Sequence, residues 1–252
     1  MKKICIIPAR MGSSRFPGKP LAKALNIPVI IHIAKRCLLS ANLDYVGVAT
    51  CDEEIKVVCE QHNIPVIMTS DKHERCTDRV SEAIEKLDFK LSSGDFVLMV
   101  QGDEILVTPD MIDSVVSDYE KNCSPVVNLV SRIYTAQDHE DPNVVKVVSA
   151  PDQRALYFSR APIPSTYRDK EALIYQQTGL IGFSKKFLKE FSDLPQTPLE
   201  KVESIDMLRV LEHGLPLKVV YTDTETVAID VPSDLERAKK ILESDSFVKK
   251  YA

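Results

Sequence analysis

Short apolar runs without polar alternation, each followed by a helical pattern, fill the first half of the chain. Runs of this kind are typical of strands that a parallel sheet buries on both faces. Since crossovers between parallel strands are right-handed, we predict an α/β fold with a doubly wound, mostly parallel sheet. The predicted strands span residues 4–8, 45–50, 65–69, 96–100 and 126–130, with helices over 29–39 and from about 52, 77 and 109.

The pattern changes after about residue 131. Residues 144–148 and 155–159 are strand-like, and Pro151-Asp152-Gln153 between them predicts a hairpin. We expect further strands at 173–183, 217–221 and 227–229, a helix over 199–213 that ends at Gly214, and a last helix that opens with a capping box over 233–236. Residues 1–252 are interpreted as one domain, in which an antiparallel insertion over about 131–190 shapes a substrate pocket or forms a dimer contact.

Composition argues against several classes of protein. The formal net charge is −5, with acidic and basic residues mixed along the chain, so a small ligand is favoured over nucleic acid. No apolar run approaches the ~18 residues of a membrane span, and the apolar stretch 4–9 is too short for a signal peptide. None of the six cysteines has the spacing of a zinc site, so we expect reduced, structural thiols in a cytoplasmic protein.

The segment that directly follows the first predicted strand is rich in glycine and positive charge. It runs Arg10-Met11-Gly12-Ser13-Ser14-Arg15-Phe16-Pro17-Gly18-Lys19-Pro20. In a doubly wound sheet this place is the carboxyl edge, where ligands bind. Glycines let backbone N–H groups approach a ligand, and the cations match several phosphate oxygens, so the segment suits a triphosphate.

Two common phosphate motifs do not fit this loop. Five residues separate Gly12 from Gly18, where a Walker A loop has four, and Pro20 stands where that motif has a magnesium-binding hydroxyl. The G-x-G-x-x-G pattern of dinucleotide-binding folds is also absent. The alternative interpretation is an ordinary basic surface loop.

Two aspartates follow predicted buried strands at the same edge of the sheet. Asp103 lies just beyond the run 96–100, and Asp230 just beyond 227–229. Magnesium prefers one or two carboxylates together with phosphate oxygens and water, so the pair is a candidate Mg²⁺ site. The alternatives are a helix cap for Asp230, although Ser233 already fits that role, and a solvated loop acid for Asp103.

Several segments spread over the whole chain resemble one known family. The most specific is Ile7-Pro8-Ala9-Arg10-x-Gly12-Ser13-Ser14-Arg15-Phe16-Pro17-Gly18-Lys19-Pro20-Leu21. The others are Gln101-Gly102-Asp103-Glu104, the segment 73–79, Tyr157-Phe158-Ser159-Arg160-x-Pro162-Ile163-Pro164, Pro198-Leu199-Glu200, the segment 208–211, and Asp230-Val231-Pro232-x-Asp234-Leu235. Together they are similar to CMP-Kdo synthetases, the 3-deoxy-manno-octulosonate cytidylyltransferases, which implies a Rossmann-like nucleotidyltransferase fold.

The resemblance implies that CTP and a 3-deoxy sugar acid give a CMP-sugar and pyrophosphate, with Mg²⁺ on Asp103 and Asp230. It implies catalytic roles for Arg10, Lys19 and Asp103. Around CTP we expect Pro8, Ala9, Arg10, Gly12, Ser13, Arg15, Lys19, Thr77, Arg79, Gln101 and Asp103. Around the sugar acid we expect Gln101, Arg160, Gln177, Ile181, Asp206 and Met207. Arg160 would face the sugar carboxylate or, alternatively, make a structural salt bridge. A homodimer follows from the resemblance alone.

Departures from the family pattern concentrate in the sugar-acid segments. Gln177 stands where the family has histidine, Ile181 where it has tyrosine, and Met207 where it has glutamine. In the first half, Arg75-Cys76 replaces Ser-Gly. A site built to hydrogen-bond hydroxyls discriminates sharply against ligands that lack them, so these changes should alter which acid fits. The alternative is drift around an unchanged substrate, or compensation by polar residues such as Arg75.

Several functions therefore stay open at the level of sequence. The acceptor is Kdo or a close analogue such as 8-amino-Kdo, or else a different acid, either another ulosonic acid or a phosphonate. A CTP-binding regulator without turnover is a second class, although retention of Lys19 with both aspartates argues against it. A cytidylyltransferase for sugar-alcohol phosphates is disfavoured, because the phosphate loop fits the sugar-acid group.

Overall fold

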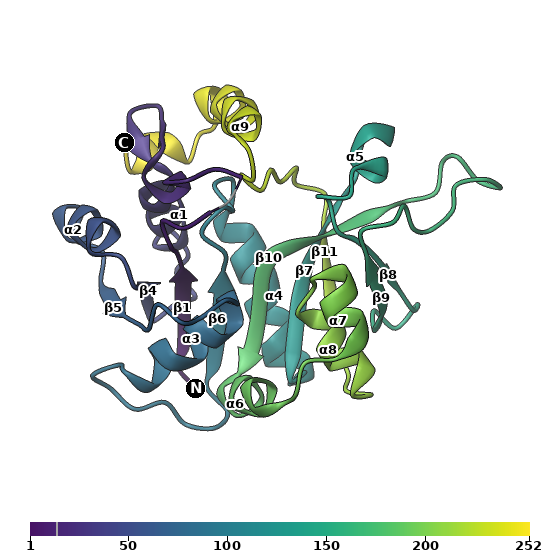
Figure 1. The fold of residues 1–252 in the computed structure, drawn as a ribbon, viewed down its shortest axis with the longest axis horizontal. Helices are drawn as coiled ribbons and strands as arrows, with labels where there is room; N and C mark the ends of the chain where they lie inside the picture. Colours follow the sequence, from purple (N-terminus) through teal and green to yellow (C-terminus); the bar gives the residue numbers. More distant parts are fainter. Residues whose placement is uncertain (14) are drawn as a thin grey trace.

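A nine-stranded mixed sheet with helices on both faces organises this computed structural model, which describes residues 1–13 and 15–252 (Figure 1). Ser14, part of the predicted phosphate loop, lies outside the described residues. The strands of this sheet are β1 (Lys3–Pro8), β4 (Tyr45–Thr50), β5 (Val66–Met68), β6 (Phe96–Val100), β7 (Val126–Arg132), β8 (Lys146–Ser149), β9 (Ala155–Ser159), β10 (Tyr175–Ser184) and β11 (Lys218–Thr222). The small strands β2 (Lys23–Ala24) and β3 (Ile27–Pro28) pair separately.

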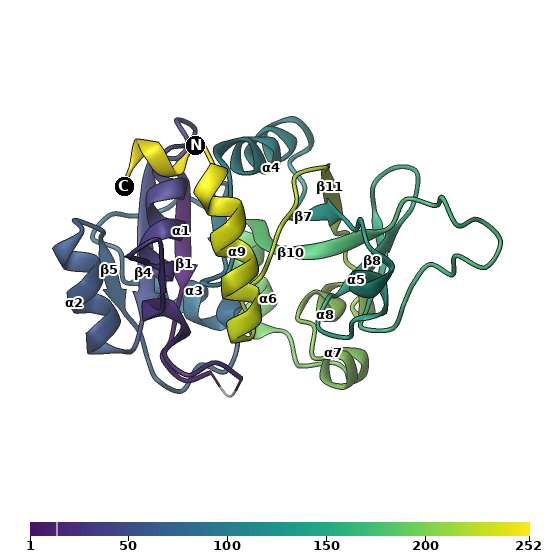
Figure 2. The same ribbon diagram turned by 90° about the horizontal axis from the view of Figure 1, so that it is seen from above.

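The helices connect these strands and cover the sheet (Figures 1 and 2). They are α1 (Val29–Cys37), α2 (Glu53–Gln61), α3 (Cys76–Glu85), α4 (Pro109–Asn122), α5 (Ala136–Glu140), α6 (Lys185–Asp193), α7 (Pro198–Glu203), α8 (Met207–Glu212) and α9 (Pro232–Ser244). Short 3-10 turns add Lys19–Leu21 and Val248–Lys250. No helix of the described residues is long and apolar enough to cross a membrane.

The main sheet has the strand order β11-β7-β10-β6-β1-β4-β5. Its neighbours pair in parallel except at β10, which runs antiparallel to both β6 and β7. This confirms the predicted α/β class with a mostly parallel sheet. Within the segment 131–190, β8 and β9 form an antiparallel extension, whereas β10 continues into the middle of the main sheet.

Two hydrophobic cores lie on opposite faces of the sheet, as expected for strands that are buried on both sides. On β1, Cys5 and Ile7 pack with α1, α4 and α9, whereas Ile4 and Ile6 pack with α3, α6 and α8. Period-two alternation of side chains along a strand produces this division. Uninterrupted apolar strands therefore identified a sheet that is covered on both faces.

Local differences from the expected elements fall in the second half of the chain. The predicted helix over 199–213 is wrong as a continuous element, because it breaks at Ser204, whose φ of 55° is left-handed, into α7 and α8. The segment 227–229 is not a strand. The last helix begins at Pro232, and Asp234 rather than Ser233 accepts hydrogen bonds at its start, from the amides of Asp230 and Val231 at 2.8 Å each.

Candidate active site

The phosphate loop leaves the carboxyl end of β1 and turns back on itself through backbone contacts. The Met11 amide donates to Asp52 Oδ2 at 2.7 Å, and the Gly18 amide donates to the Met11 carbonyl at 3.1 Å. Gly18 has a φ of 74°, a left-handed conformation that glycine adopts without steric cost. The 3-10 turn that follows points Lys19 inward, so that only 12% of its side chain is exposed.

Lys19 lies between the two predicted metal-binding carboxylates. Its Nζ is 3.0 Å from Asp103 Oδ2 and 3.7 Å from Asp230 Oδ1. Arg15 Nη2 lies 3.0 Å from Asp230 Oδ1. Burial alone would lower the pKa of Lys19, but the charges of Asp103 and Asp230 raise it above its usual value. The loop cations and both aspartates therefore meet at one edge of the sheet.

Asp230 reaches this edge without the strand that the sequence suggested. An extended segment carries it there, and the Ile229 amide donates to the Asp103 carbonyl at 3.1 Å. Asp234 then accepts from the Asp230 amide, which fixes the turn into α9. Burial and the charge of Asp103 raise the pKa of Asp230, while Lys19 and Arg15 oppose this rise. The side chains of Asp103 and Asp230 thus face each other across Lys19.

Gly102 lets this edge close tightly. A Cβ at Gly102 would lie 2.7 Å from the Pro8 carbonyl oxygen, closer than real Cβ contacts. The loop after β6 therefore lies directly against the end of β1, and only glycine fits there without a shift of the backbone. This close approach holds Asp103 near the phosphate loop.

The donor set fits a magnesium ion that also binds a nucleotide. No group of three or more His, Cys, Asp or Glu residues that could hold a metal occurs within residues 1–13 and 15–252. A dedicated all-protein site is not what magnesium requires, since it is usually bound by one or two carboxylates together with substrate phosphates and water. Asp103 Oδ1 is buried and has no hydrogen-bond partner among the described residues, which leaves it free to act as a ligand.

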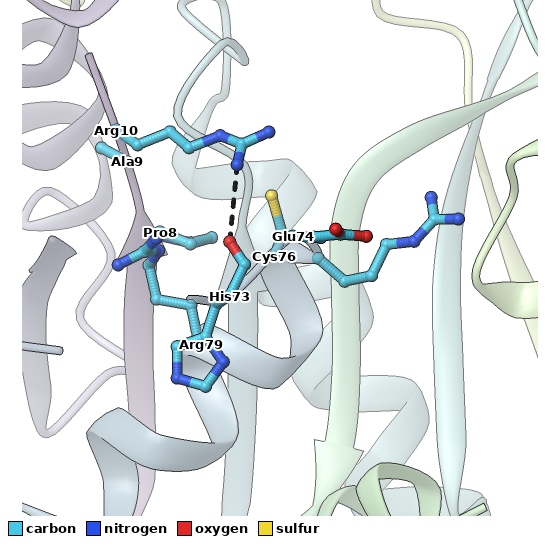
Figure 3. A pocket seen from close by; sticks show the side chains of 8 residues that line it. Pro8, Ala9, Arg10, His73, Glu74, Cys76 and Arg79 are labelled. Carbon is cyan, nitrogen blue, oxygen red and sulfur yellow. Dashed lines mark hydrogen bonds between the residues drawn. The ribbon is translucent and has the colours of Figure 1, made fainter. Parts of the chain in front are cut away.

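A small pocket beside β1 collects several residues expected around CTP (Figure 3). It is lined by Pro8, Ala9, Arg10, His73, Glu74, Arg75, Cys76 and Arg79. Arg10 is exposed, with Nη1 3.4 Å from the His73 carbonyl. Arg79 is buried and donates to Thr69 Oγ1 at 2.6 Å and to the Ser70 carbonyl at 3.1 Å, while its Nη2 has no partner among the described residues.

Three of the expected CTP residues, Gly12, Ser13 and Lys19, line neither this pocket nor the larger cleft next to it. Ser13 Oγ instead accepts from the Phe16 amide at 3.3 Å within the loop. Thr77 lines the cleft rather than the small pocket. The structure therefore divides the expected nucleotide residues between a pocket, the loop and the edge of the cleft.

A cleft of about 620 Å³ opens next to the paired aspartates. This volume is in the range of small-ligand sites. Its walls come from the start of α3, the end of β6, the first part of β10, the segment 141–145, the junction of α7 and α8, and the segment 226–234. All the residues expected around the sugar acid line it, namely Gln101, Arg160, Gln177, Ile181, Asp206 and Met207.

These six residues differ in what they offer to a ligand. Ile181 and Met207 are buried and supply apolar wall. Gln177 already donates to Asn128 Oδ1 at 2.7 Å. Arg160 donates through Nε to the Glu203 carbonyl at 2.7 Å and through Nη1 to the Pro142 carbonyl at 2.8 Å. Much of the polar capacity of Gln177 and Arg160 is thus used within the protein.

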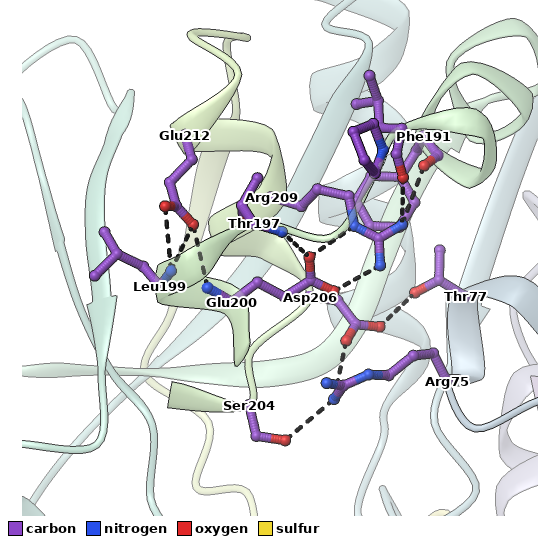
Figure 4. Close-up of polar contacts among 12 residues, drawn as sticks. Arg75, Thr77, Phe191, Thr197, Leu199, Glu200, Ser204, Asp206, Arg209 and Glu212 are labelled. Atoms are coloured by element: carbon purple, nitrogen blue, oxygen red, sulfur yellow. Dashed lines mark hydrogen bonds and ion pairs between the residues drawn. The ribbon is translucent and has the colours of Figure 1, made fainter. Parts of the chain in front are cut away.

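Asp206 belongs to a polar network across the cleft wall (Figure 4). Thr77 Oγ1 donates to its Oδ2 at 3.0 Å, and Arg75 Nη1 lies 3.4 Å from its Oδ1. Arg75 Nη1 also donates to Ser204 Oγ at 3.1 Å. Burial raises the pKa of Asp206, and the charge of Arg75 and the hydrogen bond from Thr77 oppose this rise. The network joins the start of α3 to the junction of α7 and α8.

Comparison with known proteins identifies the family. The sequence model of a family described as cytidylyltransferase matches residues 4–219. The chain belongs to this cytidylyltransferase family. The 3-deoxy-manno-octulosonate cytidylyltransferase of Thermodesulfovibrio yellowstonii is 41% identical over 255 residues, covering 98% of this chain and 100% of that protein. The resemblance found in the motifs is thereby confirmed.

Two further relatives bear on the acceptor and on the fold. The 8-amino-3,8-dideoxy-manno-octulosonate cytidylyltransferase of Shewanella sp. strain ANA-3 is 37% identical over 247 residues, with 97% of this chain and 100% of that protein covered. A solved structure of CMP:2-keto-3-deoxy-manno-octonic acid synthetase complexed with CTP superimposes with a TM-score of 0.87. It is 31% identical in sequence and covers 96% of this chain and 99% of that one.

Two residues of this cytidylyltransferase site were absent from the residues expected around either substrate. Glu104 lies in the cleft beside Asp103, and burial followed by the charge of Asp103 raises its pKa to about 7. Its Oε1 accepts from the Gly179 amide at 2.5 Å, so it also fixes β10. Arg75 lines both the pocket and the cleft. Both belong to motifs that carried the resemblance, but residue type alone did not show that they face the cleft.

Proposed function

We propose that this protein transfers CMP from CTP to a 3-deoxy sugar acid, Kdo or a close analogue such as 8-amino-Kdo, with release of pyrophosphate. The observation that supports this most is the position of Lys19, within 3.0 Å of Asp103 and 3.7 Å of Asp230, two carboxylates that line the cleft. A cation and a pair of carboxylates at one edge can hold a triphosphate together with its metal ion. The named relatives support the same chemistry.

On the nucleotide side, Arg10, Arg15 and Lys19 bind the triphosphate, and the backbone around Pro8, Ala9, Gly12 and Ser13 approaches it closely. Thr77, Arg79 and Gln101 enclose the nucleotide at the pocket and the cleft edge. Asp103 and Asp230 would hold Mg²⁺, which would supply charge withdrawal from the reacting phosphate. Lys19 would pair with phosphate oxygens of CTP, because Asp103 and Asp230, its present partners, would be engaged with the metal ion.

On the acceptor side, the sugar acid occupies the cleft between β10 and the junction of α7 and α8. Its anomeric hydroxyl attacks the α-phosphate in line and loses its proton to water, so that a P–O bond to the sugar forms while the P–O bond to pyrophosphate breaks. The cleft residues act mainly by positioning, because holding two reactants in attack geometry removes much of the entropic barrier. The lining by Gln101, Arg160, Gln177, Ile181, Asp206 and Met207 supports this location.

A substrate panel tests the proposal. The purified protein is incubated with CTP, Mg²⁺ and one acid at a time, and pyrophosphate release is followed; the panel holds Kdo, 8-amino-Kdo, another ulosonic acid and a phosphonate. We expect release with Kdo or 8-amino-Kdo only, and none when CTP is replaced by ATP or the acid is left out. A preference for the phosphonate or another ulosonic acid would reassign the acceptor, and binding of CTP without turnover on any acid would favour a regulator.

We also propose that the protein works in the cytoplasm as a homodimer that supplies an activated sugar for lipopolysaccharide or other surface polysaccharides. The state of its cysteines supports a reducing compartment, since Cys5, Cys37, Cys51, Cys59, Cys76 and Cys123 are all free thiols. Light scattering after size-exclusion chromatography measures the mass in solution. A species of one chain's mass at all concentrations contradicts the dimer.

A further inference from the structure

A carboxylate that enters the cleft meets many acidic groups and few cations, so the choice of its cationic partner is restricted. The cleft is lined by four arginines within the described part of the chain, namely Arg15, Arg75, Arg160 and Arg237. A guanidinium binds a carboxylate best through two adjacent N–H groups on one edge. The question is which of these arginines has such an edge available, given that the acceptor is the sugar acid of the proposed function.

Three of the arginines use at least one nitrogen of every two-nitrogen edge of the guanidinium for contacts within the protein. Arg15 donates through Nη1 to Asn143 and pairs through Nη2 with Asp230. Arg237 pairs through Nη1 with Asp138 and through Nη2 with Glu225. Arg160 uses Nε on the Glu203 carbonyl and Nη1 on the Pro142 carbonyl. None of the three presents an edge whose two nitrogens both lack a partner.

Arg75 is different, because only its Nη1 is engaged. That nitrogen contacts Ser204 Oγ at 3.1 Å and Asp206 Oδ1 at 3.4 Å, while Nε and Nη2 have no hydrogen-bond partner within residues 1–13 and 15–252. Nε and Nη2 form one edge of the guanidinium, so a complete two-donor face stays open. The side chain is 22% exposed and lines both the nucleotide pocket and the cleft.

A neighbouring pair shows what a purely structural arginine looks like in this wall (Figure 4). Arg209 donates to both oxygens of Glu200, from Nε at 2.8 Å and from Nη2 at 2.6 Å, and the two side chains are 3% and 0% exposed. Its Nη1 is directed at the Phe191 and Leu194 carbonyls. The Arg75–Asp206 contact is longer, one-sided and open to the cleft, as expected of an arginine that is held in place for a ligand.

We propose that Arg75 binds the carboxylate of the sugar-acid acceptor through its Nε and Nη2 edge. Asp206 and Ser204 act as positioning residues that hold Nη1 and so orient this edge, and Thr77 holds Asp206 in turn. Arg75 lies at the boundary between the nucleotide pocket and the cleft, where it can place the acid next to the phosphate that reacts. Arg160 then shapes the wall of the cleft through its two carbonyl contacts.

A substrate pair in which only the charge changes tests this assignment. Kinetics are measured for wild-type protein, Arg75→Met, Arg75→Lys and Arg160→Met with the best acid of the panel and with its methyl ester, which lacks the negative charge. In Arg75→Met we expect kcat/KM for the acid to fall roughly 10–100-fold, the range for loss of charge-assisted hydrogen bonds. The ester and the KM for CTP should change less than about twofold, so the preference for acid over ester is lost. Arg75→Lys keeps the positive charge but lacks the two-nitrogen edge of a guanidinium, so it should show more of that preference than Arg75→Met.

The matched variant Arg160→Met should keep the wild-type ratio of acid to ester even if its overall activity falls. The assignment is overturned if Arg75→Met retains that ratio, if the ratio collapses in Arg160→Met instead, or if the KM for CTP rises as much as that for the acid. If wild-type protein releases no pyrophosphate with any acid, the proposed function fails. Calorimetric titration of acid and ester into the protein–CTP complex then still decides Arg75, through the same difference between wild type and Arg75→Met.

Discussion

The two walls of the site are built in different ways. The nucleotide wall comes from the loop after β1, the loop after β6 and the segment 73–79 that leads into α3, and Gly102 packs closely against Pro8. The acceptor wall is assembled from short pieces, among them the start of β10, the segment 141–145 and the junction of α7 and α8. The phosphate loop is one continuous segment anchored to β1, so its binding residues stand together in one sequence motif. The acceptor wall combines residues from separate segments, so a single residue such as Arg75 can change which ligand it binds.

The largest effect is expected on the nucleotide wall, from Asp103→Asn. This change removes one carboxylate oxygen from the proposed metal site and a partner of Lys19 at 3.0 Å. A metal ion that stabilises the charge of a transition state contributes several kcal/mol, so its loss should lower kcat roughly 10³-fold or more. The exposed Asp193→Asn on α6 is the matched control and should behave as wild type. Near-normal turnover in Asp103→Asn with a native circular-dichroism spectrum would remove this residue from the mechanism.

On the acceptor wall, Glu200→Gln should mainly cost stability. It leaves Arg209 buried without its carboxylate partner, and breaking such a pair costs about 3–5 kcal/mol. Urea unfolding measures this cost. At temperatures where the variant is folded, its KM for the acid should rise more than its KM for CTP, because α7 and α8 shape only the acceptor side. Glu190→Gln, in the exposed pair with Lys186 at 3.6 Å, is the control and should change stability by less than about 1 kcal/mol. Equal losses of unfolding free energy in Glu200→Gln and Glu190→Gln would contradict the expectation that the buried ion pair stabilises the fold more than the exposed one.

Gly102→Ala tests the close contact between the two loops of the nucleotide wall. The added Cβ meets the Pro8 carbonyl at 2.7 Å, so the loop after β6 must move. We expect a loss of about 1–3 kcal/mol in stability from overpacking. We also expect roughly 10–100-fold lower kcat/KM, because small displacements of reacting groups are costly. Gly94→Ala, where no atom lies within 4 Å of the added Cβ, should be nearly neutral. A fully active Gly102→Ala enzyme means that the two loops are not held together as described.

The smallest effect is expected from Glu82 on α3, which contacts the Ser70 amide and His73 in the segment that leads to Arg75. Burial alone would raise the pKa of Glu82, but hydrogen bonds from Lys86, the Ser70 amide and His73 lower it from the usual 4.5 to about 2. A lowered pKa means that this carboxylate stabilises the fold above pH 4.5 and loses that contribution as the pH falls toward 2. The difference in unfolding free energy between wild type and Glu82→Gln, from urea titrations at several pH values, should therefore be constant above about pH 5 and shrink below it. A difference independent of pH contradicts this role.

The sequence predicted the fold class, and it named residues of both walls that the structure brings to one edge of the sheet and one cleft. Uninterrupted apolar strands determine a sheet covered on both faces, and the glycines and cations of the loop directly follow the first strand. The break at Ser204 was not predictable, because the apolar spacing continues across it while its backbone turns left-handed. Asp230 lies beside Asp103 for a different reason than expected, since an extended segment held by the Ile229 amide replaces the predicted strand. The proposed role of Arg75 could not be predicted from the sequence, because only the fold shows which of its nitrogens contact other residues.

Binding of Mn²⁺, as a spectroscopic substitute for Mg²⁺, tests most directly whether Asp103 and Asp230 hold a divalent ion over a bound triphosphate. Free Mn²⁺ is measured by electron paramagnetic resonance in the presence of CTP, for wild type and for Asp103→Asn combined with Asp230→Asn. We expect wild-type protein to take Mn²⁺ from the CTP solution into a tighter ternary complex. The double variant should bind CTP but add nothing to the affinity of CTP alone for the ion. Equal Mn²⁺ affinity in the two proteins would contradict this expectation.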